Sequence, residues 1–93
     1  MPVNIYSKDD PHDRLAWLCD KDWNLPTQVC ALEEWLNKNK AGIKSGSYIA
    51  DIGFCVREDA AGGGSVISPD MMRTMAELGM SLFLSEYRDG DET

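Results

Sequence analysis

Residues 48–88, YIADIGFCVREDAAGGGSVISPDMMRTMAELGMSLFLSEYR, decide the fold of this chain. Apolar residues alternate with other residues from Tyr48 to Arg57, which is the period of a half-buried β-strand. The side that carries Asp51 and Arg57 is the more polar one, so we expect it to be wet or close to a sheet edge. The segment therefore predicts a strand with one buried side.

A capped helix is predicted after this strand. Ser68 is a good N-cap residue, Pro69 fits the first helical position, and Gly79 fits the helix end. Between these signals the apolar residues recur with helical periodicity. The expected buried side consists of Met71, Met72, Met75, Ala76 and Leu78.

A second apolar strand, Ser81–Tyr87, follows this helix almost at once. A strand, a helix and a strand joined in this way form a βαβ unit, whose two strands run parallel. The helix is then expected to cover the apolar side of the first strand. These elements make residues 48–88 the scaffold of the fold.

The segment between the first strand and the helix, residues 58–65, reads EDAAGGGS and is predicted to be a flexible surface loop. Glycines that lead to a helix can cradle phosphate, but no GK[ST] motif follows here and the flanking residues are acidic. A protein partner is therefore favoured over a nucleotide. The candidate partner-binding residues in this loop are Glu58, Asp59, Gly62, Gly63 and Gly64.

The N-terminal half predicts a short strand at Val3–Ser7 and a helix that starts near Thr27, with Thr27 or Asn24 as its cap, and stops at Gly42. Residues 14–20 fit either a short helix after Pro11 or a strand, and the strand is favoured. The helix is expected to bury Val29, Leu32, Trp35 and Leu36.

These elements predict an α+β fold, a two-layer sandwich of a mixed sheet of three or four strands with two amphipathic helices on one face. A split βαβ arrangement, as in ferredoxin-like domains, fits the order of elements. We expect one domain over residues 1–93, in which residues 88–93 form a frayed tail.

The 93 residues carry a formal net charge of −7, with 43% hydrophobic and 27% charged residues, as in an ordinary globular domain. Because nucleic-acid binding depends on Lys and Arg, this charge argues against DNA or RNA as a partner. It favours a protein partner with a basic surface. No apolar run is long enough for a membrane span, so we expect a cytoplasmic protein that does not bind membranes.

Cysteine and histidine residues do not form a recognisable reactive or metal-binding motif. Cys19, Cys30 and Cys55 are far apart in sequence, which argues against a disulfide framework and a zinc site. The single histidine, His12, lies among aspartates in a predicted solvated turn. We therefore expect no catalytic residues, no metal and no cofactor, with Cys55 as the best placed of the three thiols.

Tryptophans differ in their predicted roles. Trp35 lies on the buried side of its helix, and Trp17 is predicted to be a core residue. Trp23 lies between Asp22 and Asn24 in a connection, so an exposed indole there would be a candidate interface anchor.

Several motifs of residues 32–87 occur together in a known pattern: the strand YIADIGFCV, a glycine-containing loop, and ISPDMMRTMAELGMSLFLSEY with its Ser-Pro helix start. In these features the C-terminal half resembles the bacterial DUF4279 family of uncharacterised domains. That family tends to have a Trp-containing strand before its first long helix, which corresponds to residues 14–19. The resemblance implies a fold and supplies no catalytic residues.

Three functional hypotheses remain open. The first is a small, acidic, non-enzymatic module that binds another protein, of the immunity type or encoded by a phage or mobile element. The second is a small-ligand-binding or thiol-dependent enzyme domain, with a pocket between helices and sheet near Cys55. The third is a homodimer formed by strand-edge pairing through Ser81–Tyr87 or Val3–Ser7.

Overall fold

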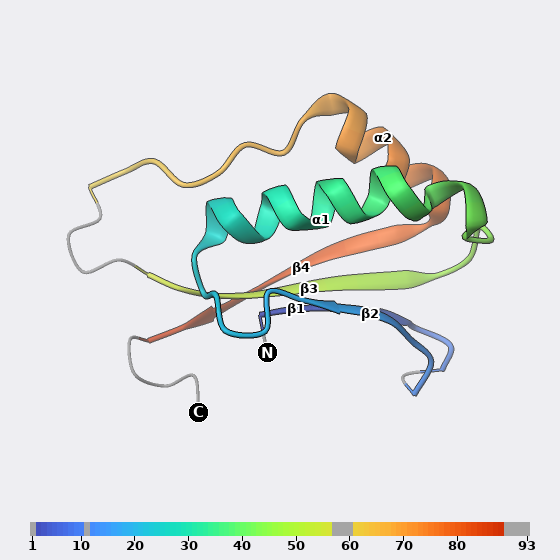
Figure 1. The fold of residues 1–93 in the computed structure, drawn as a ribbon, viewed down its shortest axis with the longest axis horizontal. Coiled ribbons are helices and arrows are strands. Elements are labelled where there is room, and N and C mark those ends of the chain that lie inside the picture. Colours follow the sequence, from blue (N-terminus) through green and yellow to red (C-terminus); the bar gives the residue numbers. More distant parts are fainter. Residues whose placement is uncertain (1, 11, 57–60, 89–93) are drawn as a thin grey trace.

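The computed structural model describes residues 2–10, 12–56 and 61–88 (Figure 1). The elements, in chain order, are β1 Val3–Ser7, β2 Arg14–Leu18, α1 Leu25–Asn39, the short 3₁₀ helix η1 Lys40–Gly42, β3 Tyr48–Cys55, α2 Pro69–Leu78 and β4 Met80–Tyr87. No helix within these ranges is both long and apolar enough to cross a lipid bilayer.

The strands form one mixed sheet in the order β2-β1-β3-β4. Strand β1 is antiparallel to both of its neighbours, whereas β3 and β4 are parallel. The segment β2-α1-β3 is thus a split βαβ unit with β1 inserted between its parallel strands, and β3-α2-β4 is the predicted βαβ unit with adjacent strands. The predicted α+β class and the mixed sheet are confirmed.

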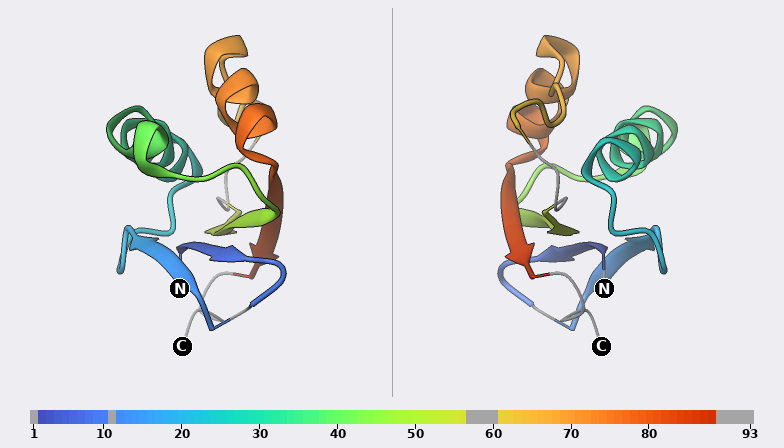
Figure 2. Two further views of the ribbon diagram at one scale, coloured as in Figure 1. Left: turned by 90° about the vertical axis from the view of Figure 1, so that its right-hand side faces the viewer. Right: turned by 90° about the vertical axis from the view of Figure 1, so that its left-hand side faces the viewer.

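Both helices lie on the same face of the sheet, as Figure 2 shows. The core forms between this face and the helices, because β1, β3 and the start of β4 turn their apolar side chains toward α1 and α2. The buried apolar residues are Val3, Ile5, Val29, Leu32, Leu36, Ala50, Ile52, Met71, Met75, Leu78 and Met80. We call the opposite side of the sheet the open face, since no described helix covers it.

Helix α2 has the predicted caps. Ser68 Oγ accepts a hydrogen bond from the Met71 N–H at 3.1 Å, and Gly79 adopts the left-handed conformation with φ 78°. The predicted buried side is partly wrong, because Met72 and Ala76 are exposed and Thr74 is buried. The observed stripe of Met71, Thr74, Met75 and Leu78 follows the i, i+3, i+4, i+7 rule.

Helix α1 starts at Leu25, two residues before Thr27, and Asn24 is its N-cap. The predicted buried residues Val29, Leu32 and Leu36 are confirmed, while Trp35 is half-buried. The fully buried Gln28 is the residue that the pattern missed. Its Nε2 donates to Asp22 O at 2.7 Å and to Gly53 O at 2.6 Å, which ties the first turn of α1 to β3.

Two predictions about strands are decided by the sheet order. Residues 14–18 form a strand, which confirms the favoured alternative. The prediction that Val3–Ser7 could be a free edge of the sheet is wrong, because β1 is paired on both sides. The remaining candidate edge, Ser81–Tyr87, lies in β4 at the end of the sheet.

Candidate functional site

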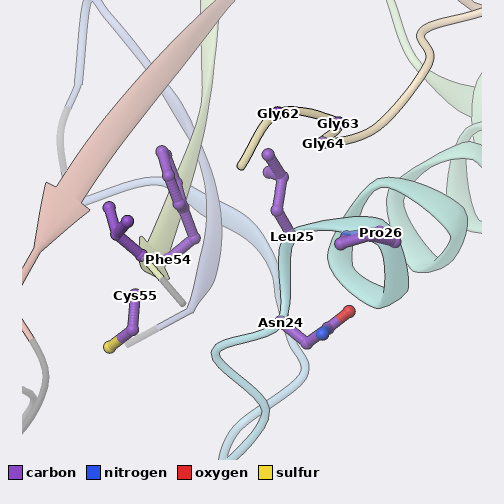
Figure 3. Close-up of a pocket in the computed structure, with 9 residues that line it drawn as sticks. Asn24, Leu25, Pro26, Phe54, Cys55, Gly62, Gly63 and Gly64 are labelled. Carbon is purple, nitrogen blue, oxygen red and sulfur yellow. The ribbon is translucent and has the colours of Figure 1, made fainter. Parts of the chain in front are cut away.

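A cleft of about 460 Å³ opens between the first turn of α1 and the end of β3 (Figure 3). Its floor and walls come from three segments that are distant in sequence: the start of α1, the last residues of β3 and the glycines before α2. The lining residues are Asn24, Leu25, Pro26, Phe54, Cys55, Val56, Gly62, Gly63 and Gly64.

Backbone and side-chain hydrogen bonds fix the two sides of this cleft. Asn24 Oδ1 accepts from the Thr27 N–H at 3.2 Å and from Thr27 Oγ1 at 3.1 Å, so the carboxamide oxygen serves as the helix cap. The Cys55 N–H donates to Trp23 O at 3.1 Å, which attaches the connection before α1 to the end of β3.

The side chains that face the cleft are mainly apolar. In Figure 3, Phe54 and Leu25 point toward the space below the glycines, whereas the Cys55 sulfur points away from them. Val56, the residue just after β3, borders this opening and is 46% exposed. Such a lining suits an apolar ligand better than an ionic one.

The structure places the predicted site residues in two groups. Gly62, Gly63 and Gly64 line the cleft and all have positive φ, at 118°, 83° and 140°. Trp23 is half-buried, and its ring packs edge-on against Tyr87 with the ring centroids 5.4 Å apart. Glu58 and Asp59 lie outside the described residues, as do residues 57–60 in general and residues 89–93 of the tail predicted at 88–93.

The thiols lie in different environments. Cys19 is half-buried, and this desolvation, together with the charge of Asp22, raises the pKa of its thiol above the ordinary value. A raised pKa lowers the thiolate fraction, so Cys19 is a poor nucleophile at neutral pH. Cys30 is exposed on α1. Within residues 2–10, 12–56 and 61–88, no three His, Cys, Asp or Glu side chains come together as a metal site, and His12 is exposed.

The open face of the sheet carries the aromatic side chains that sequence reasoning missed. Trp17, predicted to be core, is 46% exposed, and Phe83 is 53% exposed. Strand register puts both in one row across the sheet, with Asn4 and Asp51 between them. The row spans roughly 14 Å, which is three strand spacings.

Polar groups lie close to these aromatic rings. The guanidinium carbon of Arg14 is 4.3 Å from the centroid of the Trp17 ring. Within the row, Asp51 Oδ1 accepts a hydrogen bond at 2.7 Å from Ser85 Oγ, which lies two residues after Phe83 in β4, and the buried Asn4 Oδ1 accepts no hydrogen bond within the described structure. The open face thus presents exposed aromatic rings, a residue type enriched at protein interfaces, among polar neighbours.

Comparison with known proteins found no family model, curated protein or solved structure that matches the chain. The resemblance to the DUF4279 family therefore stays a prediction.

Proposed function

We propose that the chain is a non-enzymatic module that binds another protein, and that the open face of the sheet is its docking surface. The observation that supports this most is the exposure of three aromatic residues, Trp17, Phe83 and Tyr87, at 46%, 53% and 37%. Aromatic side chains on a surface are the residue type most often found at the energetic centre of an interface.

The partner that we propose has basic groups around an apolar contact. The chain has a net charge of −7, and Asp51 lies on the open face between the aromatic residues. Complementary charge would speed association with such a partner and orient it. This proposal includes modules of the immunity type and modules encoded by phages or mobile elements. The free thiols of Cys19 and Cys30 fit the reducing cytoplasm.

Direct titration tests this proposal. A protein captured from lysate of the native host would be purified and titrated against wild type, Trp17→Ser and Val66→Ser. Val66 is a matched control because it is an exposed apolar residue, 85% accessible, in the segment before α2 and away from the sheet. We expect Trp17→Ser to weaken binding at least about tenfold and Val66→Ser to leave it unchanged.

Three results would overturn the proposal: no stoichiometric partner at low salt, equal affinity of the Trp17→Ser variant, or a partner that protects the helices and not the sheet from hydrogen exchange. Circular dichroism of each variant checks that the fold is intact.

The apolar cleft favours a second candidate function, binding of a small apolar ligand between α1 and the end of β3. A cleft of about 460 Å³ lies within the size range of ligand sites. A thermal-shift screen with aliphatic and aromatic compounds should find one that raises the melting temperature. Val56→Lys, which puts a charge at the cleft, should abolish that shift, whereas Val66→Lys should not. A flat screen would exclude this function.

A further inference from the structure

The sheet has two edges, and they differ in how they are protected. Strand β2 is short, begins with the charged Arg14, and has a register shift against β1 between Ile5 and Tyr6. Charge, shortness and a bulge are the devices by which native proteins prevent an edge strand from pairing with another chain.

Strand β4 is neither short nor interrupted by a register shift. Its eight residues pair with β3 in one unbroken register, from Met80 opposite Tyr48 to Tyr87 opposite Cys55. Its one charged residue is Glu86, near the end. Figure 2 shows β4 as the outermost strand, with α2 above the sheet and not beside the strand. Within the described ranges no strand pairs with its outer edge.

Exposed apolar residues occur on both sides of β4. Phe83 is 53% exposed on the open face, and Leu84 is 51% exposed on the side of the helices. An edge strand that is long, regular and apolar on both sides is suited to pairing with another strand.

The sequence of β4 identifies the strand that fits this edge. Residues 81–85 read Ser-Leu-Phe-Leu-Ser, which is the same in both directions. If two copies of β4 run antiparallel about a two-fold axis at Phe83, Phe83 meets Phe83, Leu82 meets Leu84, and Ser81 meets Ser85. Directly opposite residues of an antiparallel pair point to the same face, so each contact joins like with like.

The same register also avoids electrostatic conflict. It places Glu86 opposite Met80, so the two carboxylates at the seam do not meet. A two-fold interface must be self-complementary, and the palindromic segment 81–85 satisfies this condition with like residues opposite each other.

We propose that β4 pairs antiparallel with β4 of a second copy, centred on Phe83, and that two chains thereby share one sheet of eight strands, four from each. This pairing does not depend on the proposed protein partner, because it uses the backbone edge of β4. Phe83 belongs to both proposed surfaces, whereas Trp17, on the strand at the other edge, belongs to the proposed docking surface alone. Both helical layers stay on one side of the shared sheet, and the two open faces become continuous.

Light scattering and sedimentation of the full chain test the pairing. We expect a concentration-dependent mass up to twice 10.4 kDa for the wild type. Phe83→Lys places two lysines opposite each other and should give only monomer. Trp17→Lys, the matched control, adds the same charge to an exposed aromatic position at the other edge and should still dimerise. Circular dichroism confirms that each variant is folded.

A crosslinking experiment tests the register. Residues directly opposite in an antiparallel pair are close enough for a disulfide. Under mild oxidation, Phe83→Cys should link to position 83 of the second copy, identified by peptide mapping. Ser81→Cys should not self-link, since its predicted neighbour is Ser85. A wild-type monomer at millimolar concentration, a dimer that persists in Phe83→Lys, or equal self-linking of both cysteine variants would overturn the proposal.

Discussion

Gly79, which ends α2, is a residue that the fold cannot replace. Its φ of 78° is strained for any residue with a side chain, and an added Cβ would collide with the carbonyl oxygen of Gly46. We expect Gly79→Ala to lower the free energy of unfolding by at least about 2 kcal/mol, measured by urea denaturation. Gly42→Ala is the control, because an added Cβ there meets nothing within 4 Å. Equal losses in both variants would contradict this account.

Cys19 gives a prediction for pH and reactivity. Its thiol pKa is raised, first by burial and second by the charge of Asp22. A raised pKa means less thiolate in mildly alkaline buffer, so alkylation by iodoacetamide should be slower in the folded than in the urea-unfolded chain. The folded chain holds the proton of this thiol more tightly than the unfolded chain does. The contribution of the thiol to the free energy of unfolding is therefore complete below the ordinary pKa of 9.0 and is lost as the pH rises above it.

Removal of the Asp22 charge should reverse part of this effect. We expect Asp22→Asn to increase the alkylation rate of Cys19 a few-fold, because it removes a charge that raises the pKa of the thiol. The amide keeps an oxygen that can accept from the Asn24 N–H, as Asp22 Oδ1 does at 2.9 Å, so the local structure is retained. Asp20→Asn, which changes a neighbouring exposed carboxylate, is the control. Peptide mapping separates Cys19 from the other thiols, and the same increase in both variants would assign the effect to net charge.

At the scale of elements, Ser68 links the two helices. Its Oγ accepts from the Met71 N–H at 3.1 Å and donates to Glu33 Oε2 of α1 at 2.8 Å. We expect Ser68→Ala to cost about 1–2 kcal/mol of unfolding free energy, since it removes both the cap and the bond to α1. Ser65→Ala, at an exposed position, should change stability little. A double-mutant cycle with Glu33→Ala should show coupling, and additive losses would exclude the helix–helix bond.

Local signals explain why α2 and its neighbouring strands could be predicted. The Ser68 and Gly79 caps act within one turn of helix, and the alternation of β3 is visible in consecutive residues. The buried side of α2 was harder to predict, since Met72 and Met71 are chemically equal and only the direction of the sheet decides which is covered. Propensity and caps therefore located the helix, while packing determined its orientation.

At the scale of the whole molecule, the candidate sites depend on contacts that are distant in sequence. Trp17 was predicted to be buried because it is apolar in an alternating strand, but its exposure depends on which face of the sheet the helices cover. The cleft likewise requires that Leu25 and Phe54 meet, which follows from the sheet order and not from either segment. The sequence therefore predicts the two layers, and only the assembled sheet shows its open face and edges.

Net charge makes the two proposed associations respond in opposite ways to salt. Two copies with a charge of −7 repel each other, while their proposed seam at 81–85 is uncharged, so screening should tighten the β4 pairing. A basic partner would be attracted by the same charge, so screening should weaken its binding.

We expect the dimer dissociation constant, measured by sedimentation, to decrease when the sodium chloride concentration is raised. The partner dissociation constant, measured by calorimetry at concentrations where only the monomer sediments, should rise. A dimer that salt loosens would require charged contacts at the seam, and partner binding that salt leaves unchanged would show that the acidity of the chain serves solubility and not recognition.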